Sequence, residues 1–233
     1  MIGWLAGIVV LMGGTMTEQG ASLCRDAEIA QKFSDFADAS TDHTPGGLQD
    51  AFGAHLSSLK ECLMQWVEDG GERDGLPLTR GVTRESYRLG ALRLLGLLYP
   101  KNAGVASWVS RNMRSWPESL QTQALATLGD IGGEESFVVL RAQVRTADGK
   151  RRELIWNSLL FVDGRRFAAE LESIAPTHED QVLVGAMLMA VNQPVALPAL
   201  RKLRSLVPEK AGVYAEHIRE IEKQDGGGHD DEN

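Results

Sequence analysis

The residue types that most often carry catalysis or bind metals are scattered along this 233-residue chain. None of its five histidines (His43, His55, His178, His217 and His229) forms a recognised metal-binding pattern with a second His, Cys, Asp or Glu. The nearest approach is His178-Glu179-Asp180, and such residues more often cap a helix amino terminus and complement its dipole. The sequence also lacks a phosphate-binding glycine loop, a Gly-x-Ser-x-Gly elbow and a Cys-x-x-Cys pair. It therefore predicts no catalytic site, no cofactor and no metal.

A group of basic residues is the strongest candidate for a binding site. The chain carries 24 Lys and Arg against 32 Asp and Glu, and this net charge of −8 disfavours a general nucleic-acid binder. Residues 80–166 nevertheless hold 14 basic and 8 acidic groups. Seven of the basic residues fall close to predicted turns: Arg141, Arg145, Lys150, Arg151, Arg152, Arg165 and Arg166. They predict a docking patch for an acidic protein, an anionic polymer or a lipid headgroup, or alternatively a solvated rim that pairs with neighbouring acids.

Trp116 is the one tryptophan of the helical region whose position favours contact with a partner. It stands beside Pro117 in a predicted turn, whereas Trp66, Trp108 and Trp156 have spacings typical of a core. We therefore add Trp116 to the predicted binding surface, with ordinary packing of the turn as the alternative.

The two cysteines, Cys24 and Cys62, are placed so that a helical hairpin would bring them level. Residues 23–37 and 47–69 both have the apolar spacing of helices, and the breaker-rich segment between them is centred near residue 43, equally far from both cysteines. The hairpin predicts a disulfide, with two buried thiols as the alternative. A disulfide in turn indicates an oxidising compartment.

The amino terminus points to the same compartment. Residues 2–12 are uncharged and apolar, and a small-residue zone follows them, as in a secretory signal peptide that is removed near Leu23. No Lys or Arg precedes the apolar run, so a buried first helix and an uncleaved anchor stay open as alternatives. The run is too short to span a bilayer.

From Thr83 onward the sequence is a succession of short amphipathic helices separated by a few breaker residues, with no convincing strand alternation. The predicted helices are 83–99, 102–114, 117–131, 134–146, 150–162, 164–174, 178–191, 194–206 and 209–223. Helices this short, each apolar on one face, must stack against one another to be stable.

Parts of these helices recur with a period of about 30 residues. Ala91-Leu92 with Leu95-Gly96 returns as Ala124-Leu125 with Leu128-Gly129, then as Ile155-Trp156 with Leu159, and faintly at residues 186–191. The stretch from Gln123 to Leu140 resembles the short HEAT-like repeat of the bilin-lyase type. In that repeat an Ala-Leu pair, a Leu-Gly pair and a small turn precede the second helix of a hairpin.

The resemblance implies an all-α fold, an α-solenoid of about four HEAT-like helical hairpins preceded by an N-terminal helical hairpin. A single irregular helical bundle is the alternative. The predicted division is a signal peptide 1–22, the N-terminal hairpin and linker 23–80, HEAT-like repeats 81–207, a C-terminal capping helix 208–224 and a disordered acidic tail 225–233.

Together these features predict an exported, periplasmic or extracellular scaffold that binds an acidic protein partner and has no catalytic activity. They predict neither a nucleic-acid partner nor a membrane span. Because some HEAT-like repeat proteins are bilin lyases or DNA glycosylases, an enzyme of lyase or glycosylase type is one alternative. A self-associating structural subunit of an envelope complex and a cytoplasmic location are others.

Overall fold

The computed structural model describes residues 24–37, 52, 56–76, 78 and 82–226, and all of its regular elements within these ranges are helical. The α-helices are α2 (Ala27–Ala37), α4 (Leu56–Asp69), α5 (Arg84–Leu98), α6 (Ala103–Asn112), α7 (Glu118–Ile131), α8 (Gly133–Val144), α9 (Gly149–Val162), α10 (Gly164–Ala169), α11 (Leu171–Ile174), α12 (His178–Val191), α13 (Leu197–Leu206) and α14 (Ala211–Gly226). Three short 3-10 segments join them: η2 (Met113–Ser115), η3 (Pro194–Ala196) and η4 (Pro208–Lys210).

These helices follow the predicted ones closely, with one difference that bears on function. The helix predicted over 164–174 is broken at Glu170 into α10 and α11. The predicted start of the disordered tail at residue 225 is wrong, because Asp225 and Gly226 belong to α14. The predicted signal peptide, residues 47–51 and 53–55 of the second predicted helix, and residues 227–233 of the predicted tail lie outside the described residues.

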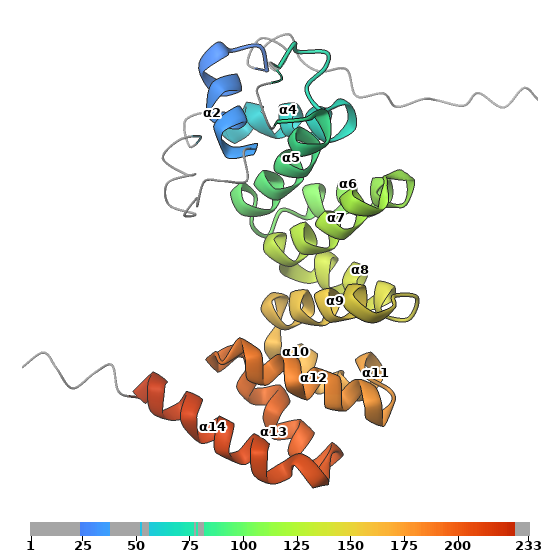
Figure 1. The fold of residues 1–233 in the computed structure, drawn as a ribbon, viewed down its shortest axis with the longest axis vertical. Coiled ribbons are helices and arrows are strands. Elements are labelled where there is room, and N and C mark those ends of the chain that lie inside the picture. Colours follow the sequence, from blue (N-terminus) through green and yellow to red (C-terminus); the bar gives the residue numbers. More distant parts are fainter. Residues whose placement is uncertain (1–23, 38–51, 53–55, 77, 79–81, 227–233) are drawn as a thin grey trace, which may run out of the picture.

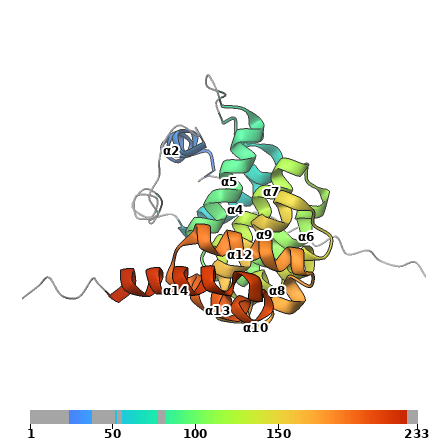
Figure 2. The same ribbon diagram turned by 60° about the horizontal axis from the view of Figure 1, so that its bottom comes forward.

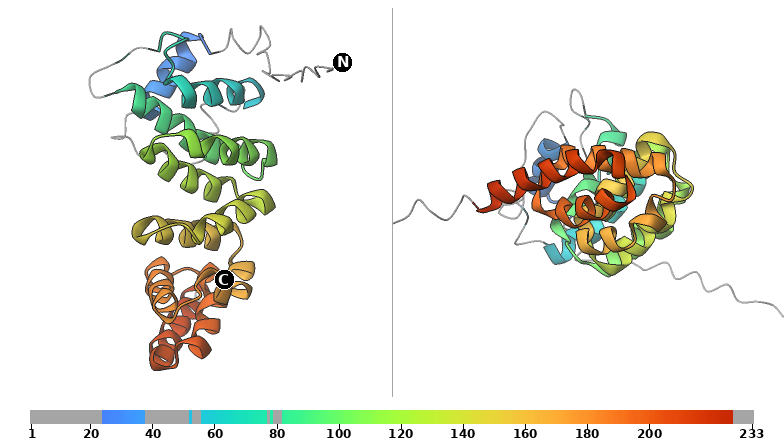
Figure 3. Two further views of the ribbon diagram at one scale, coloured as in Figure 1. Left: turned by 90° about the vertical axis from the view of Figure 1, so that its right-hand side faces the viewer. Right: turned by 90° about the horizontal axis from the view of Figure 1, so that it is seen from below.

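The helices succeed one another along the long axis of the molecule (Figure 1). Helix α5 packs on α7 and α7 on α9, while α6 packs on α8 behind them. Helices α12, α13 and α14 group at the carboxyl-terminal end, and α2 lies beside α5 near the other end (Figure 2). The side view shows the same succession from the amino-terminal to the carboxyl-terminal helices (Figure 3).

Small and hydroxylated side chains set the close spacing of α5, α7 and α9. A Cβ added to Gly129 would lie 2.9 Å from the Cβ of Ser158, so only a residue without a side chain fits there. The buried Thr127 hydroxyl donates to the carbonyl of Leu92 at 3.0 Å, and the Ser158 hydroxyl donates to the carbonyl of Leu125 at 3.4 Å. Leu92 and Leu125 are the leucines of the first two Ala-Leu pairs, so one interhelical contact recurs at equivalent positions.

The amino-terminal helices are joined covalently and by aromatic stacking. The sulfur atoms of Cys24 and Cys62 lie 2.02 Å apart, with their Cα atoms 5.4 Å apart, as in a disulfide, and both side chains are buried. The Phe33 ring of α2 stacks on Trp66 of α4, with ring centroids 4.5 Å apart, and on Tyr87 of α5 at 5.4 Å. Helix α2 is therefore held against both α4 and α5.

Candidate functional site

Four of the seven predicted basic residues meet at one edge of the helix stack. Arg145 and Arg152 line a cavity of about 550 Å³, and Arg141, Arg145 and Arg166 line a second of about 310 Å³. The two cavities share Arg145 and Ser173. We call the two together the arginine groove.

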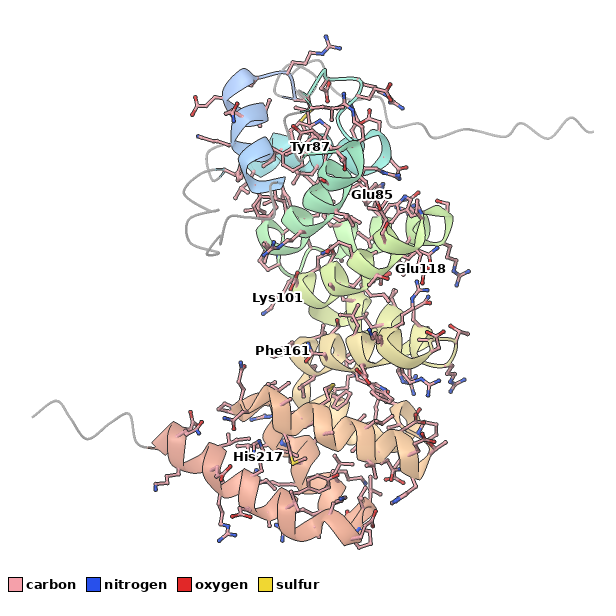
Figure 4. All side chains as sticks on the ribbon, viewed as in Figure 1. Glu85, Tyr87, Lys101, Glu118, Phe161 and His217 are labelled. Carbon is pink, nitrogen blue, oxygen red and sulfur yellow. A yellow bond between two sulfur atoms is a disulfide. The ribbon has the colours of Figure 1, made fainter. Side chains whose placement is uncertain are left out.

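The groove is built from the end of α8, the first turn of α9, the two pieces α10 and α11, and the start of α12. It belongs to the edge at which α7, α9 and α12 begin, which Glu118, the first residue of α7, marks in Figure 4. Lys101 and Phe161 mark the opposite edge, near the ends of α5 and α9.

Local capping fixes the chain at the mouth of the groove. Thr177 is the N-cap of α12, and its hydroxyl accepts a hydrogen bond from the backbone N–H of Asp180 at 3.0 Å. Arg145 is the C-cap of α8, so its side chain projects from a helix end. The carbonyl of Ala147, in the turn that follows α8, accepts from the guanidinium of Arg152.

Arg152 is held in one orientation. Its Nε and Nη2 donate to the Ala147 carbonyl at 3.0 and 2.8 Å, and its Nη1 donates to Oδ1 of Asp180 at 2.8 Å. Asp180 is only 6% exposed, so this ion pair is partly shielded from water. These three hydrogen bonds orient the guanidinium beside the larger cavity.

Arg141 and Arg166 are tied together by acids from neighbouring helices. Glu170, at the break between α10 and α11, pairs with both arginines, and Glu134 of α8 pairs with Arg166. The hydrogen bonds to Glu170 and, to a smaller extent, to Glu134 raise the pKa of Arg166. The guanidinium carbon of Arg166 also lies 4.1 Å from the centroid of the Phe137 ring. The charges of Arg141 and Arg166 are therefore balanced by those of Glu134 and Glu170.

Arg145 differs from these three residues. Its side chain is exposed and forms no ion pair within the part of the chain that the structure describes. Three of the four arginines therefore pair with neighbouring acids, while Arg145 presents an unneutralised charge to the groove, and the docking patch stays a prediction.

The other three predicted basic residues lie elsewhere. Arg151 points to α7, where its Nη2 donates to Oε1 of Gln121 at 2.7 Å, and Lys150 is exposed at the start of α9. Arg165 lines a separate cavity of about 390 Å³ that Arg201 of α13 also lines. None of these three residues lines either cavity of the groove, and the single patch of seven basic residues stays a prediction.

The assignment of Trp116 to the binding surface is wrong. Its side chain is 4% exposed, its ring centroid lies 5.5 Å from that of Trp108, and its Nε1 donates to Oε1 of Glu68 at 3.3 Å. Pro117 terminates the turn, but Trp116 folds back onto α4 and α6 instead of facing solvent. Packing of the turn was the alternative from the sequence.

Sequence reasoning missed the apolar lining of the groove. Val144 and Ile174 are buried along the larger cavity, and Pro176 completes its apolar side. Val138, which is 50% exposed on α8, lines the smaller one. Val138 belongs to an apolar stripe in the sequence and Pro176 to a helix junction, and neither position indicates a cavity; the break at Glu170, between α10 and α11, carries neither Pro nor Gly.

The residues suspected of metal binding have other partners. Nε2 of His178 lies 2.8 Å from Oε1 of Glu209, and Asp180 faces Arg152. Over the ranges that the structure describes, no cluster of three His, Cys, Asp or Glu is arranged to hold a metal ion.

The helices from α2 to α14 that the structure describes include none with both the length and the apolar character needed to cross a membrane. Comparisons with protein-family models, with curated proteins and with solved structures found no match to this chain.

Proposed function

We propose that the protein is a non-catalytic binding scaffold, an α-solenoid of HEAT-like helical hairpins whose arginine groove docks an acidic segment of a partner protein. Repeat solenoids present extended surfaces for such docking. The observation that carries the proposal is Arg145, a cation with no ion pair among the described residues, which lines the same cavity as the oriented guanidinium of Arg152.

Recurring contacts between successive hairpins support the solenoid. The hydrogen bond from Thr127 to Leu92 spans 35 residues, and the one from Ser158 to Leu125 spans 33. At the groove, Arg152 reaches Asp180 across 28 residues. Each contact joins one hairpin to the next along the chain, which is the pattern expected of a one-dimensional stack.

The charge of the groove supports an acidic partner. Arg141, Arg145, Arg152 and Arg166 line it, whereas the acids paired with them are Glu134, Glu170 and Asp180. A carboxylate placed between Arg145 and Arg152 would gain hydrogen bonds to charged donors, which are stronger than those between neutral groups.

The buried pair of Cys24 and Cys62 supports an oxidising location. We propose that the protein is exported and that residues 1–22 are its signal peptide. Intact mass of protein expressed from the full gene tests this directly. A mass beginning near Leu23 that rises by two hydrogen masses on reduction supports export, whereas full-length protein with two free thiols contradicts it.

Binding of a defined acidic peptide tests the groove. The probe is a short fluorescein-labelled peptide rich in Glu and containing one Leu, titrated with the protein by fluorescence polarisation at low and at high salt. We expect saturable binding that weakens as salt rises, because ion pairs at an exposed rim are screened. Arg145→Glu should weaken binding about tenfold or more, since a hydrogen bond to a charged group contributes about 1.5–3 kcal/mol.

Arg219→Glu is the matched control. Arg219 is exposed on α14, outside the groove, and its Nε donates to a carbonyl of its own helix, so the variant makes the same charge change at a different place. Equal binding by the native protein and Arg145→Glu, or equal losses in the two variants, would show that the groove does not dock the acidic peptide.

A further inference from the structure

We infer that the arginine groove recognises an apolar side chain next to a carboxylate in a segment of the partner, and not acidic charge alone. The inference rests on the proposed function and names the chemistry of the segment that binds.

The larger cavity has both a polar and an apolar lining. Its polar lining residues are Arg145, Arg152, Ser173, Thr177 and Asp180, of which Asp180 is already paired with Arg152, and its apolar lining residues are Val144, Ile174 and Pro176. Its volume of about 550 Å³ exceeds the space that one carboxylate fills and lies in the range of about 300–1,000 Å³ that is usual for ligand pockets. A carboxylate alone would leave the apolar lining in contact with water.

Arg152 can bind a carboxylate while it keeps its present hydrogen bonds. The Ala147 carbonyl and Asp180 take three of the five N–H donors of Arg152, and its two other donors have no hydrogen-bond partner among the described residues. Arg145 brings the charge that is not neutralised. Because the Arg152 guanidinium is already oriented, its side chain loses little conformational entropy when it donates hydrogen bonds to a ligand.

The smaller cavity favours an apolar neighbour in the same segment. Two of its three arginines, Arg141 and Arg166, already pair with Glu170 and Glu134, and the third, Arg145, is shared with the larger cavity, while the half-exposed Val138 gives the smaller one an apolar surface. A further carboxylate there would compete with Glu170 and Glu134. An acidic residue at the larger cavity beside an apolar one therefore matches the groove better than a uniformly acidic run.

A pair of peptides separates this inference from the proposed function. The labelled Glu-rich peptide with one Leu is compared with the same peptide carrying Ser in place of Leu. We expect the Leu peptide to bind about tenfold tighter or more, since even one methylene placed in an apolar pocket changes affinity about tenfold. If the two peptides bind with equal affinity, and if both lose affinity at high salt and in Arg145→Glu, the inference is overturned and the proposed function stands. Binding of neither peptide would overturn both.

Blocking the groove tests where the Leu side chain sits. Ser173 is exposed and lines both cavities, so Ser173→Phe fills the groove without replacing a core residue. Ser205→Phe makes the same change at an exposed site on α13, and thermal melting followed by circular dichroism checks that both variants fold. We expect the Leu preference to vanish in Ser173→Phe and to persist in Ser205→Phe.

Two outcomes would contradict the assignment. A Leu preference that survives in Ser173→Phe would place the apolar contact outside the groove. An unlabelled oligonucleotide that displaces the labelled Leu peptide as well as unlabelled Leu peptide does would show that the groove responds to negative charge of any kind, because phosphates offer no apolar side chain.

Discussion

Removal of the link between Cys24 and Cys62 is the perturbation whose cost follows most directly from the structure. The double variant Cys24→Ala/Cys62→Ala deletes the covalent bond and keeps two small apolar residues at buried positions. The stacking of Phe33 on Trp66 stays in place, so α2 keeps its noncovalent contacts with α4. The variant therefore isolates the contribution of the crosslink more cleanly than reduction does, because a reductant must first reach two buried sulfur atoms.

The expected magnitude comes from the length of the closed loop. The two cysteines are 38 residues apart, and closing a loop of that length lowers the entropy of the unfolded chain enough to stabilise the fold by about 4 kcal/mol at 25 °C. For a chain of this size each kcal/mol shifts the melting temperature by about 2–4 °C, so the variant should melt about 8–16 °C below the oxidised protein.

Circular dichroism melting of the oxidised protein and the double variant measures this difference. Hydrogen exchange adds a local readout, since the amides of α2 should lose protection before those of α7. A melting temperature within about 2 °C of the native value would refute the reasoning, because it would mean that the crosslink constrains the unfolded chain far less than its length requires.

Two further perturbations test packing at other places. Tyr99→Phe removes the hydroxyl that donates to the Leu56 carbonyl at 2.6 Å and should cost about 1 kcal/mol in urea unfolding. Burial raises the pKa of Tyr99 above its ordinary value of 10.0, so the neutral hydroxyl contributes its full stability below pH 10 and less as the pH rises further. The Tyr99→Phe variant should therefore lose this alkaline decrease in stability. An unchanged decrease in the variant would contradict the assignment to Tyr99. Gly185→Ala places a Cβ against the Tyr214 ring and should destabilise the fold by about 1–3 kcal/mol, whereas Gly212→Ala meets no neighbour and serves as the control in the same unfolding assay. Equal stability of the two alanine variants would show that the Tyr214 side chain moves aside without loss of stability.

Local patterns in the sequence predicted most of the helices. Pro117 and the Gly132-Gly133 pair mark the ends of α7 closely, and the paired spacing of Cys24 and Cys62 anticipated their contact. The helix ends depend on residues that are near in sequence, and the contact of the two cysteines depends on their equal distance from the predicted turn. A single sequence is therefore enough to predict them.

The groove could be predicted only in part because it depends on how helices that are distant in sequence are rotated against one another. Arg141 of α8 meets Glu170, which follows α10, and no local pattern sets that contact. Trp116 is buried beside Trp108, and Glu68, 48 residues earlier, accepts a hydrogen bond from its indole. Its position in a turn beside Pro117 predicts exposure, whereas its contact with α4 comes from a residue that is distant in sequence.

The Cys24–Cys62 link also makes the two ends of the molecule mechanically unequal. The crosslink ties Cys24, three residues before α2, to α4 near one end. At the other end α14 packs against α13, and Arg201 of α13 donates a hydrogen bond to Glu222 of α14, so tension along the long axis meets a covalent bond between helical segments only near the amino-terminal helices. We expect a pulled molecule to unravel first from Gly226 and to keep its amino-terminal helices together longest. A partner held in the groove, at the start of α12, would be released by such a load before the clamped end yields.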